Sequence, residues 1–212
     1  MGRIRVDLFA SLDGVAQAPG GPQEDAQGGF RFGGWQAPLF DEMVGEWVDA
    51  NLRGLDALLL GRRTYDIFAG YWPHVTDGPD DGIAALFNRV PKYVASRNPD
   101  VVLHWQRSSL LGPDLASEIR RLRQRHERVH VIGSLNLFQT LMAERLFDEL
   151  ALCVYPLVLG QGKRVFEPGE IASRLHLVAP AETSPKGAVQ LRYALAEGVP
   201  TTGDMTQPDR GE

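Results

Sequence analysis

The sequence lacks the features that are typical of secreted and membrane-spanning proteins. Cys153 is the only cysteine among 212 residues, so no internal disulfide can form. No apolar run approaches the roughly 20 residues needed to span a bilayer, and the start, MGRIRVDLFASLDG, lacks the apolar region of a signal peptide. The net charge of -5 disfavours an extended nucleic-acid-binding surface. We therefore expect a cytoplasmic protein without nucleic-acid or membrane partners.

Strand-like and helix-like segments alternate along the chain. The predicted strands are 4–11, 56–61, 91–96, 101–105, 128–133, 148–160 and 189–195. The predicted helices are 38–52, with Pro38 in its first turn, 64–72, 112–127 and 134–146. The alternation predicts a single α/β domain over residues 1–197, with a mostly parallel central sheet and helices on both faces. No helix separates the last two strands, so the C-terminal edge is predicted to be antiparallel. Residues 198–212 have few apolar groups and are predicted to form a tail.

Several predicted strands end in residues that suit an anion, and ligands of open α/β sheets gather at such ends. Gly61, Arg62, Arg63 and Thr64 form one such end, with Thr64 a predicted helix N-cap. A helix start offers unpaired N–H groups and partial positive charge, and arginines add bidentate donors for phosphate. The alternative is an ordinary turn with a capping threonine and two solvated arginines.

Three further strand ends carry candidate residues. Gly133-Ser134 repeats the glycine and helix-start pattern, although an ordinary cap is the alternative. Ser96-Arg97 combines a hydroxyl with a cation, as a phosphomonoester site would. Asp13 places a carboxylate where the first strand meets a long Gly- and Pro-rich loop, and its alternative is a carboxylate that caps a turn.

Other chemistries have weaker support in the sequence. His126 and His130 are four residues apart, but the segment between them changes from helix to strand, so no metal site is predicted. Cys153 is predicted to be a small core residue. We find no Gly-x-Ser-x-Gly elbow of a serine hydrolase.

The segments SLDG, GRRTYDIF, ASR, VIGS and DELALCVYPLVLGQG occur in one order at suitable spacing. Over residues 3 to 196 this pattern resembles the dihydrofolate-reductase-like superfamily and, more closely, its RibD C-terminal domain family. The resemblance implies an NADPH-dependent reductase, similar to the 5-amino-6-(5-phosphoribosylamino)uracil reductase of riboflavin biosynthesis. The predicted cofactor-binding residues are Gly61, Arg62, Arg63, Thr64, Ser96, Arg97, Gly133 and Ser134. Arginine-bearing turns suit the additional phosphate of NADPH better than they suit NADH.

The resemblance also implies where the substrate binds. Trp35, Gly160 and Gly162 would surround the nicotinamide, and Asp13 would orient the substrate or supply a proton. The acceptor would be a polarised C=N or C=O group of a small heterocyclic or carbonyl compound. Classical dihydrofolate reductases use one acid of the first helix instead. That helix carries acids at positions 41, 42, 46 and 49, a pattern more typical of a solvated face.

The sequence leaves two alternatives open. Ser134 replaces the second glycine of the family pattern, which favours a non-catalytic ligand-binding or assembly protein that has kept the fold. The resemblance implies a homodimer formed through the apolar segment 149–159, although the same segment could be wholly internal.

Overall fold

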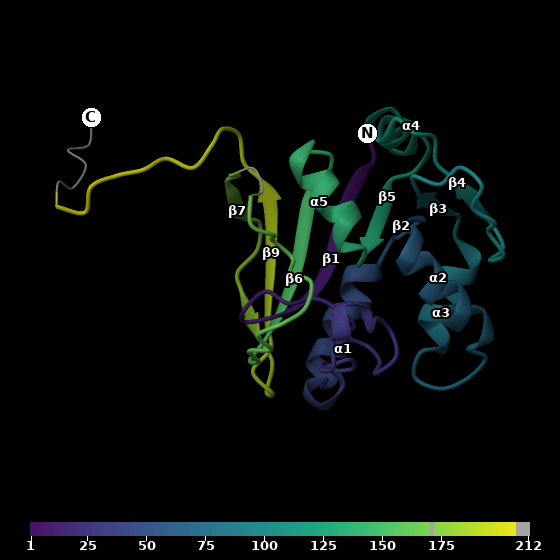
Figure 1. Ribbon diagram of the computed structural model, residues 1–212, viewed down its shortest axis with the longest axis horizontal. Coiled ribbons are helices and arrows are strands. Elements are labelled where there is room, and N and C mark those ends of the chain that lie inside the picture. The colour runs from purple at the N-terminus through teal and green to yellow at the C-terminus, as the bar shows by residue number, and fades with distance from the viewer. Residues whose placement is uncertain (170–171, 207–212) are drawn as a thin grey trace.

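A nine-stranded sheet runs through the computed structural model of the protein, which describes residues 1–169 and 172–206 (Figure 1). Its strands are β1 (Arg3–Ser11), β2 (Ala57–Gly61), β3 (Lys92–Ala95), β4 (Ser108–Leu110), β5 (Arg128–Ile132), β6 (Glu149–Tyr155), β7 (Leu175–Leu177), β8 (Glu182–Thr183) and β9 (Val189–Leu195). The order is β4-β3-β2-β5-β1-β6-β9-β7, with β8 also paired to β9. All pairs from β4 to β6 are parallel, and the pairs that involve β9 are antiparallel. The predicted mixed sheet is thus confirmed.

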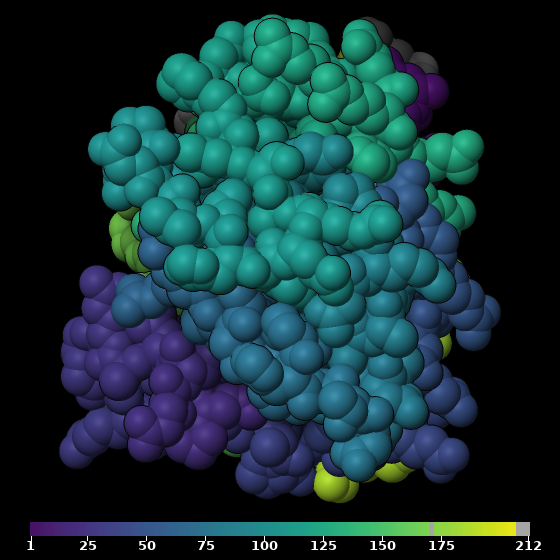
Figure 2. Space-filling model, turned by 90° about the vertical axis from the view of Figure 1, so that its right-hand side faces the viewer, coloured from purple at the N-terminus to yellow at the C-terminus, as the bar shows by residue number. Residues whose placement is uncertain are grey.

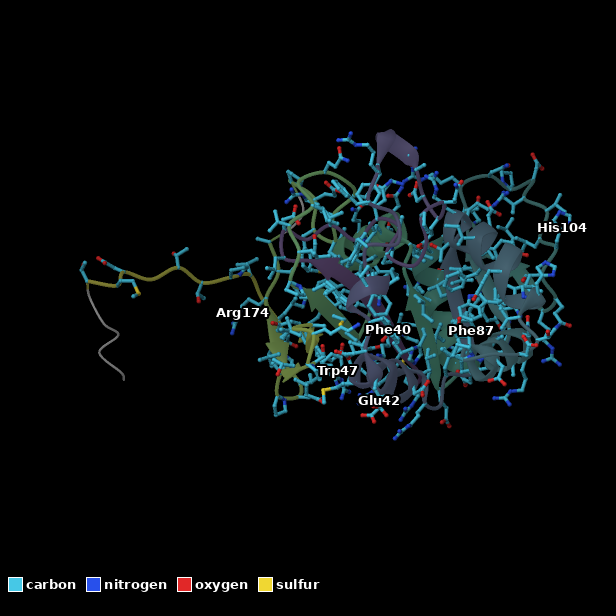
Figure 3. The ribbon with its side chains drawn as sticks, turned by 90° about the horizontal axis from the view of Figure 1, so that it is seen from below. Phe40, Glu42, Trp47, Phe87, His104 and Arg174 are labelled. Atoms are coloured by element: carbon cyan, nitrogen blue, oxygen red, sulfur yellow. The ribbon has the colours of Figure 1, made fainter. Side chains whose placement is uncertain are left out.

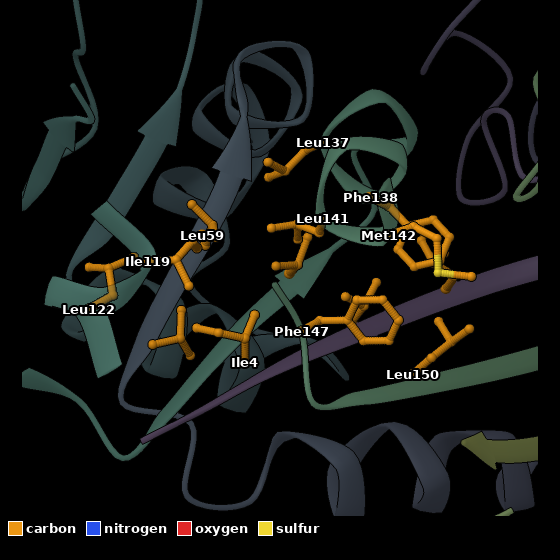
Figure 4. Packing of buried hydrophobic residues seen from close by; sticks show 14 of the residues in the cluster. Ile4, Leu59, Ile119, Leu122, Leu137, Phe138, Leu141, Met142, Phe147 and Leu150 are labelled. Atoms are coloured by element: carbon orange, nitrogen blue, oxygen red, sulfur yellow. The ribbon is translucent and has the colours of Figure 1, made fainter. Parts of the chain in front are cut away.

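Helices cover both faces of this sheet. They are α1 (Glu42–Leu52), α2 (Arg62–Tyr71), α3 (Asp81–Arg89), α4 (Leu115–Arg125) and α5 (Leu135–Ala143), with short 3-10 helices at Gln27–Gly29, Ala37–Leu39 and Trp72–His74. Ile119 of α4 and Phe138 of α5 pack with Ile4 and Leu59 in the largest core cluster (Figure 4). Because successive strand residues point to opposite faces, Leu58 and Leu60 pack instead with residues of α2 and α3.

Several local predictions were wrong. The Asp41 carboxylate accepts a hydrogen bond from the Val44 amide (3.0 Å), so the first helix begins after Asp41, and Pro38 lies in a preceding 3-10 helix. Helix α2 begins at Arg62 with Gly61 as N-cap, which places Thr64 inside its first turn. No strand forms over 101–105, and β4 takes the edge position instead. Helix α3 was not predicted.

The apolar segment 149–159, from which a homodimer was predicted, forms β6 in its first part, and this strand is buried within one chain. Strand β6 lies between β1 and β9, and its residues Leu150, Ala151, Cys153 and Tyr155 are buried. Because β6 is not an edge strand, it offers no free edge to a second copy of the chain. The homodimer therefore stays a prediction.

Residues 198–206 form no helix or strand and extend away from the sheet (Figure 1). Residues 207–212 of the predicted tail lie outside the described residues. Within residues 1–169 and 172–206, every helix is too short or too polar to cross a bilayer.

Candidate functional site

A cavity of about 2130 Å³ lies at the carboxyl ends of β1, β2, β3 and β5. Its walls come from the loop after β1, from α1, α2, α3 and α5, and from the segments that follow β3 and β4. Figure 2 shows part of the loop after β1, in purple, lying beside the blue segment that holds α2. All eight predicted cofactor-binding residues line this cavity: Gly61, Arg62, Arg63, Thr64, Ser96, Arg97, Gly133 and Ser134. The fold thus brings together strand ends that are about 70 residues apart in the sequence.

The N-termini of α2 and α5 both open on this cavity. Among the described residues, no side chain caps either helix start. The first N–H groups of such helices are oriented toward an incoming anion, and the helix dipoles favour negative charge there. Arg62 adds a guanidinium at the first turn of α2, where it pairs with the Asp66 carboxylate at 2.7 Å.

The two turns contact each other through Ser134. This residue is left-handed (φ 67°), a conformation that glycine adopts more readily than serine. Its hydroxyl oxygen accepts a hydrogen bond from the Thr64 hydroxyl (3.1 Å). A Cβ atom on Gly61 would collide with the Ser134 side chain. Gly61 therefore makes room for Ser134, and the serine hydroxyl is directed toward α2.

A third cationic position lies at the end of β3. The Ser96 hydroxyl accepts a hydrogen bond from the Asn98 amide (3.1 Å), which fixes the turn. Arg97 is exposed, lines the cavity and forms no ion pair with the described residues. Its guanidinium is therefore available to a ligand anion.

Arg63 differs from its neighbour because its guanidinium binds the loop after β1. It contacts Asp25 at 3.2 Å and also donates a hydrogen bond to Gln27. Asp25 pairs in turn with Lys163 at 2.6 Å. Burial raises the pKa of Asp25, but the hydrogen bond from Lys163 and the nearby cations hold it below its usual value. Arg63 thus links α2 to two loops, a role that was not predicted.

The cavity continues into an apolar space between α1 and the α2–α3 pair. We call this space the α1–α3 compartment, and its walls are Val48, Leu52, Ile67, Phe68, Ile83 and Phe87. Figure 3 labels Phe87 of this compartment and Phe40, which lines the same cavity. The same cavity is thus lined by the candidate phosphate-binding turns and by this compartment, which offers an apolar environment for a ring.

A buried ionic cluster lies on the sheet under α1. Asp7 of β1 lines the cavity although only 9% of its surface is exposed. One carboxylate oxygen accepts from Arg5 Nε (2.8 Å), and the other lies 2.9 Å from Nδ1 of the buried His130. Arg5 also pairs with Glu149 (3.2 Å), which pairs with Arg192 (2.9 Å). This cluster was not predicted, although charged residues at period-two positions of two apolar strands, RIRVDLFAS and RVHVI, are a signal for it.

Asp13 is absent from the described residues that line the cavity. Its carboxylate accepts hydrogen bonds from the Ser11 hydroxyl (2.6 Å) and from the amides of Leu159 (3.1 Å) and Gly160 (2.9 Å). Although burial raises its pKa, these hydrogen bonds lower it to about 2. At neutral pH, Asp13 is therefore ionised and carries no proton to donate. The geometry favours the alternative in which this carboxylate fixes a turn.

The residues predicted on the substrate side also lie outside the described cavity lining. Trp35 is buried, donates to the Gln17 carbonyl (2.8 Å) and packs edge-on against Tyr155. A Cβ atom on Gly162 would lie 2.7 Å from Val15, so this glycine makes room for protein side chains. Trp35 and Gly162 thus contact other parts of the protein, and a Cβ atom on Gly160 would meet open space.

The acids of the first helix do not line the cavity within the described chain. Asp41 caps the helix, and Figure 3 shows Glu42 on the outer surface. Neither histidine considered as a metal ligand lies in a group of three or more ligating side chains within the described parts. His126 forms a hydrogen bond with the Tyr93 hydroxyl (2.9 Å). Burial raises the pKa of the Cys153 thiol to about 12, as expected for a core residue.

The family is shown by a match to the RibD C-terminal domain model over residues 3–189. The chain belongs to the RibD C-terminal domain family. It is 27% identical over 195 residues to the uncharacterized protein YyaP of Bacillus subtilis (strain 168), and the alignment covers 90% of this chain and 94% of YyaP.

Solved structures share the fold of this RibD C-terminal domain protein. A protein of Shewanella sp. PV-4 superimposes with a TM-score of 0.71 at 20% identity, covering 92% of this chain and 99% of the other. A pyrimidine reductase-like protein of Corynebacterium diphtheriae gives 0.62 at 16% identity, with 93% of each chain covered. Dihydrofolate reductase of Enterococcus faecalis, complexed with NADP(H), gives 0.56 at 14% identity, covering 92% and 98%. The dihydrofolate-reductase-like fold is therefore shown.

Proposed function

We propose that this protein is an NADPH-dependent reductase that transfers a hydride to a small heterocyclic or carbonyl substrate. The observation that carries the proposal is the convergence of the α2 and α5 N-termini with Arg62 and Arg97 on one cavity. Helix starts and forked cations are the groups that bind phosphate esters. The volume, about 2130 Å³, is large enough for a dinucleotide and a second ring.

The residues present fit this cofactor. The turns at Gly61 and Gly133 would hold the pyrophosphate against the two helix starts, while Ser96 and Arg97 would hold the 2′-phosphate. When bound, NADPH supplies the hydride. The protein would align the acceptor, and the apolar walls of the α1–α3 compartment would exclude water from the reacting atoms.

Membership of the RibD C-terminal domain family supports a substrate related to riboflavin precursors. Because the apolar compartment would accept many flat rings, the substrate class stays broad here. We also propose a cytoplasmic location and a homodimer, and light scattering at micromolar concentration measures the latter. A monomer mass would contradict the dimer.

Cofactor binding and turnover are tested in two steps. Trp72 lines the cavity, so NADPH should quench tryptophan emission on binding. A parallel NADH titration should give weaker binding, and equal or tighter NADH binding would contradict the preference. Loss of the reduced-nicotinamide absorbance is then followed with 5-amino-6-(5-phosphoribosylamino)uracil and a panel of imines and carbonyl compounds.

The second candidate is a non-catalytic protein that has kept the ligand site. The left-handed Ser134 favours it because a side chain there narrows the space between the two helix starts. Quenching by NADPH without turnover on the whole panel would support this candidate over the reductase.

A further inference from the structure

The cavity lining includes a buried carboxylate, Asp7, that has no role in the proposed cofactor site. Val6 and Leu8 point into the core that includes α4 and α5 residues, so Asp7 between them faces the opposite side of the sheet. Val48 and Leu52 of α1 line the same cavity as Asp7 on that side. The Asp7 side chain keeps 11% of its surface exposed, and Asp7 is one of the residues that line the cavity.

The surrounding chain holds this carboxylate in one position. Arg5 and His130 each contact a different oxygen, at 2.8 and 2.9 Å. His130 is only 2% exposed and sits beside Arg5 in the register of the parallel strands β1 and β5. Each carboxylate oxygen has a second lone pair, so two protein contacts leave acceptor capacity for a ligand.

The ionic cluster around Asp7 leaves one hydrogen-bond donor unpaired within the described chain. A terminal nitrogen of Arg5, Nη2, is buried and has no hydrogen-bond partner there. Buried charges are retained at a cost in desolvation and are often associated with binding rather than stability. The apolar compartment above the carboxylate would strengthen a hydrogen bond to it, because few waters compete there.

We propose that Asp7 anchors the substrate, and that the substrate is a flat heterocycle that presents N–H donors to this carboxylate. An amino group next to a protonated ring nitrogen matches a carboxylate with two parallel hydrogen bonds. Arg5 and His130 are positioning residues that fix the carboxylate. This inference rests on the proposed function for the role of the compartment, and it narrows the substrate to N–H-bearing rings.

A matched pair of probes tests the anchor. 2-Aminopyridine and 2-methylpyridine have nearly the same shape, and only the first carries an N–H donor beside the ring nitrogen. Chemical-shift titration of the full-length protein, with and without NADPH, should show at least tenfold tighter binding of 2-aminopyridine. The ring protons of His130, assigned with His130→Gln, should shift with 2-aminopyridine alone. Equal binding of the probes, or no response to either, would overturn the anchor.

Variants test whether the preference for 2-aminopyridine over 2-methylpyridine depends on Asp7. Asp7→Asn should reduce the preference to within twofold, because the amide presents an N–H where the carboxylate presents only acceptors. Glu144→Gln is the control, since it removes an exposed carboxylate from another wall of the same cavity and should keep the preference. Arg5 keeps its ion pair with Glu149 in this variant. If Asp7→Asn still fails to fold, Asp7→Asn combined with Arg5→Gln removes both charges of the lost pair. A preserved preference in the folded variant would overturn the proposal.

The two proposals fail separately. Tryptophan quenching reports NADPH binding without any substrate, so its absence would count against the reductase alone. Quenching in the wild type together with no discrimination between the probes would count against the Asp7 anchor alone.

Discussion

Two glycine-rich regions of this protein look alike in sequence and differ in the structure. The turns at Gly61 and Gly133 open on the cavity, whereas Asp13 and Gly162 lie outside its described lining and connect their two loops to each other. Both combine glycines with charged or polar residues at strand ends. The first region leaves its helix starts and Arg97 available to a ligand. In the second, a carboxylate pairs with backbone amides, and a glycine makes room for Val15 and Phe30. A glycine therefore indicates close approach, but it does not say whether ligand or protein approaches.

The sharpest test of this contrast is Gly162→Ala. The new Cβ would lie 2.7 Å from Val15 and 2.8 Å from Phe30, at a backbone φ of 116°. We expect the free energy of unfolding to fall by about 3 kcal/mol, with NADPH affinity unchanged in the folded fraction. Urea unfolding measures the loss. Gly160→Ala is the matched control, because its φ is 74° and nothing lies within 4 Å of the new Cβ. It should cost about 1 kcal/mol. Equal losses would show that packing is not the cause.

Asp13→Asn tests whether this carboxylate is structural. It should lower the free energy of unfolding by about 1 kcal/mol at pH 7 through weakened hydrogen bonds. The pKa of about 2 lies below the usual 3.8, so the ionised form stabilises the fold above about pH 4. That stabilisation is lost as the pH falls through about 2. The difference in unfolding free energy between wild type and Asp13→Asn should therefore shrink at that pH. A large loss of turnover without any loss of stability would instead restore Asp13 as a catalytic residue.

Arg97→Gln tests the ligand side of the contrast. It should weaken NADPH binding by about tenfold, because a charge-assisted hydrogen bond to the 2′-phosphate contributes about 1.5 kcal/mol. NADH binding and the unfolding free energy should stay the same. Fluorescence titrations with both cofactors measure this. Arg120→Gln, an exposed arginine of α4 outside the cavity lining, is the control. A parallel loss of NADH affinity would argue against a 2′-phosphate contact.

The smallest effect is expected for Ser134→Gly. Glycine removes the left-handed strain at φ 67°, which costs about 1 kcal/mol, but loses the contact with Thr64 and gains freedom in the unfolded chain. We expect a change of less than about 1 kcal/mol, and NADPH affinity equal to or tighter than that of wild type. Thermal unfolding and titration measure both. A weaker affinity would show that the serine hydroxyl binds the phosphate directly.

The sequence by itself determined the mostly parallel centre of the sheet, its antiparallel C-terminal edge and the strand ends that carry the candidate phosphate-binding residues, but it did not determine the edge strand β4. Period-two apolar patterns and glycines at strand-to-helix turns are local signals, so Gly61, Arg97 and Ser134 could be placed at one edge from the order of elements alone. The RibD C-terminal domain model matches residues 3–189, a range that includes these positions.

Only the tertiary structure decided which polar groups form hydrogen bonds or ion pairs within the chain and which remain available to a ligand. Asp13 and Arg63 are bound by residues far away in the sequence, at Leu159–Gly160 and Asp25, and no local pattern encodes such partners. Asp7 and His130 are 123 residues apart and meet because β1 and β5 pair in parallel. Charge and hydrogen-bond satisfaction depend on distances across the sheet, and those distances exist only once the chain has folded.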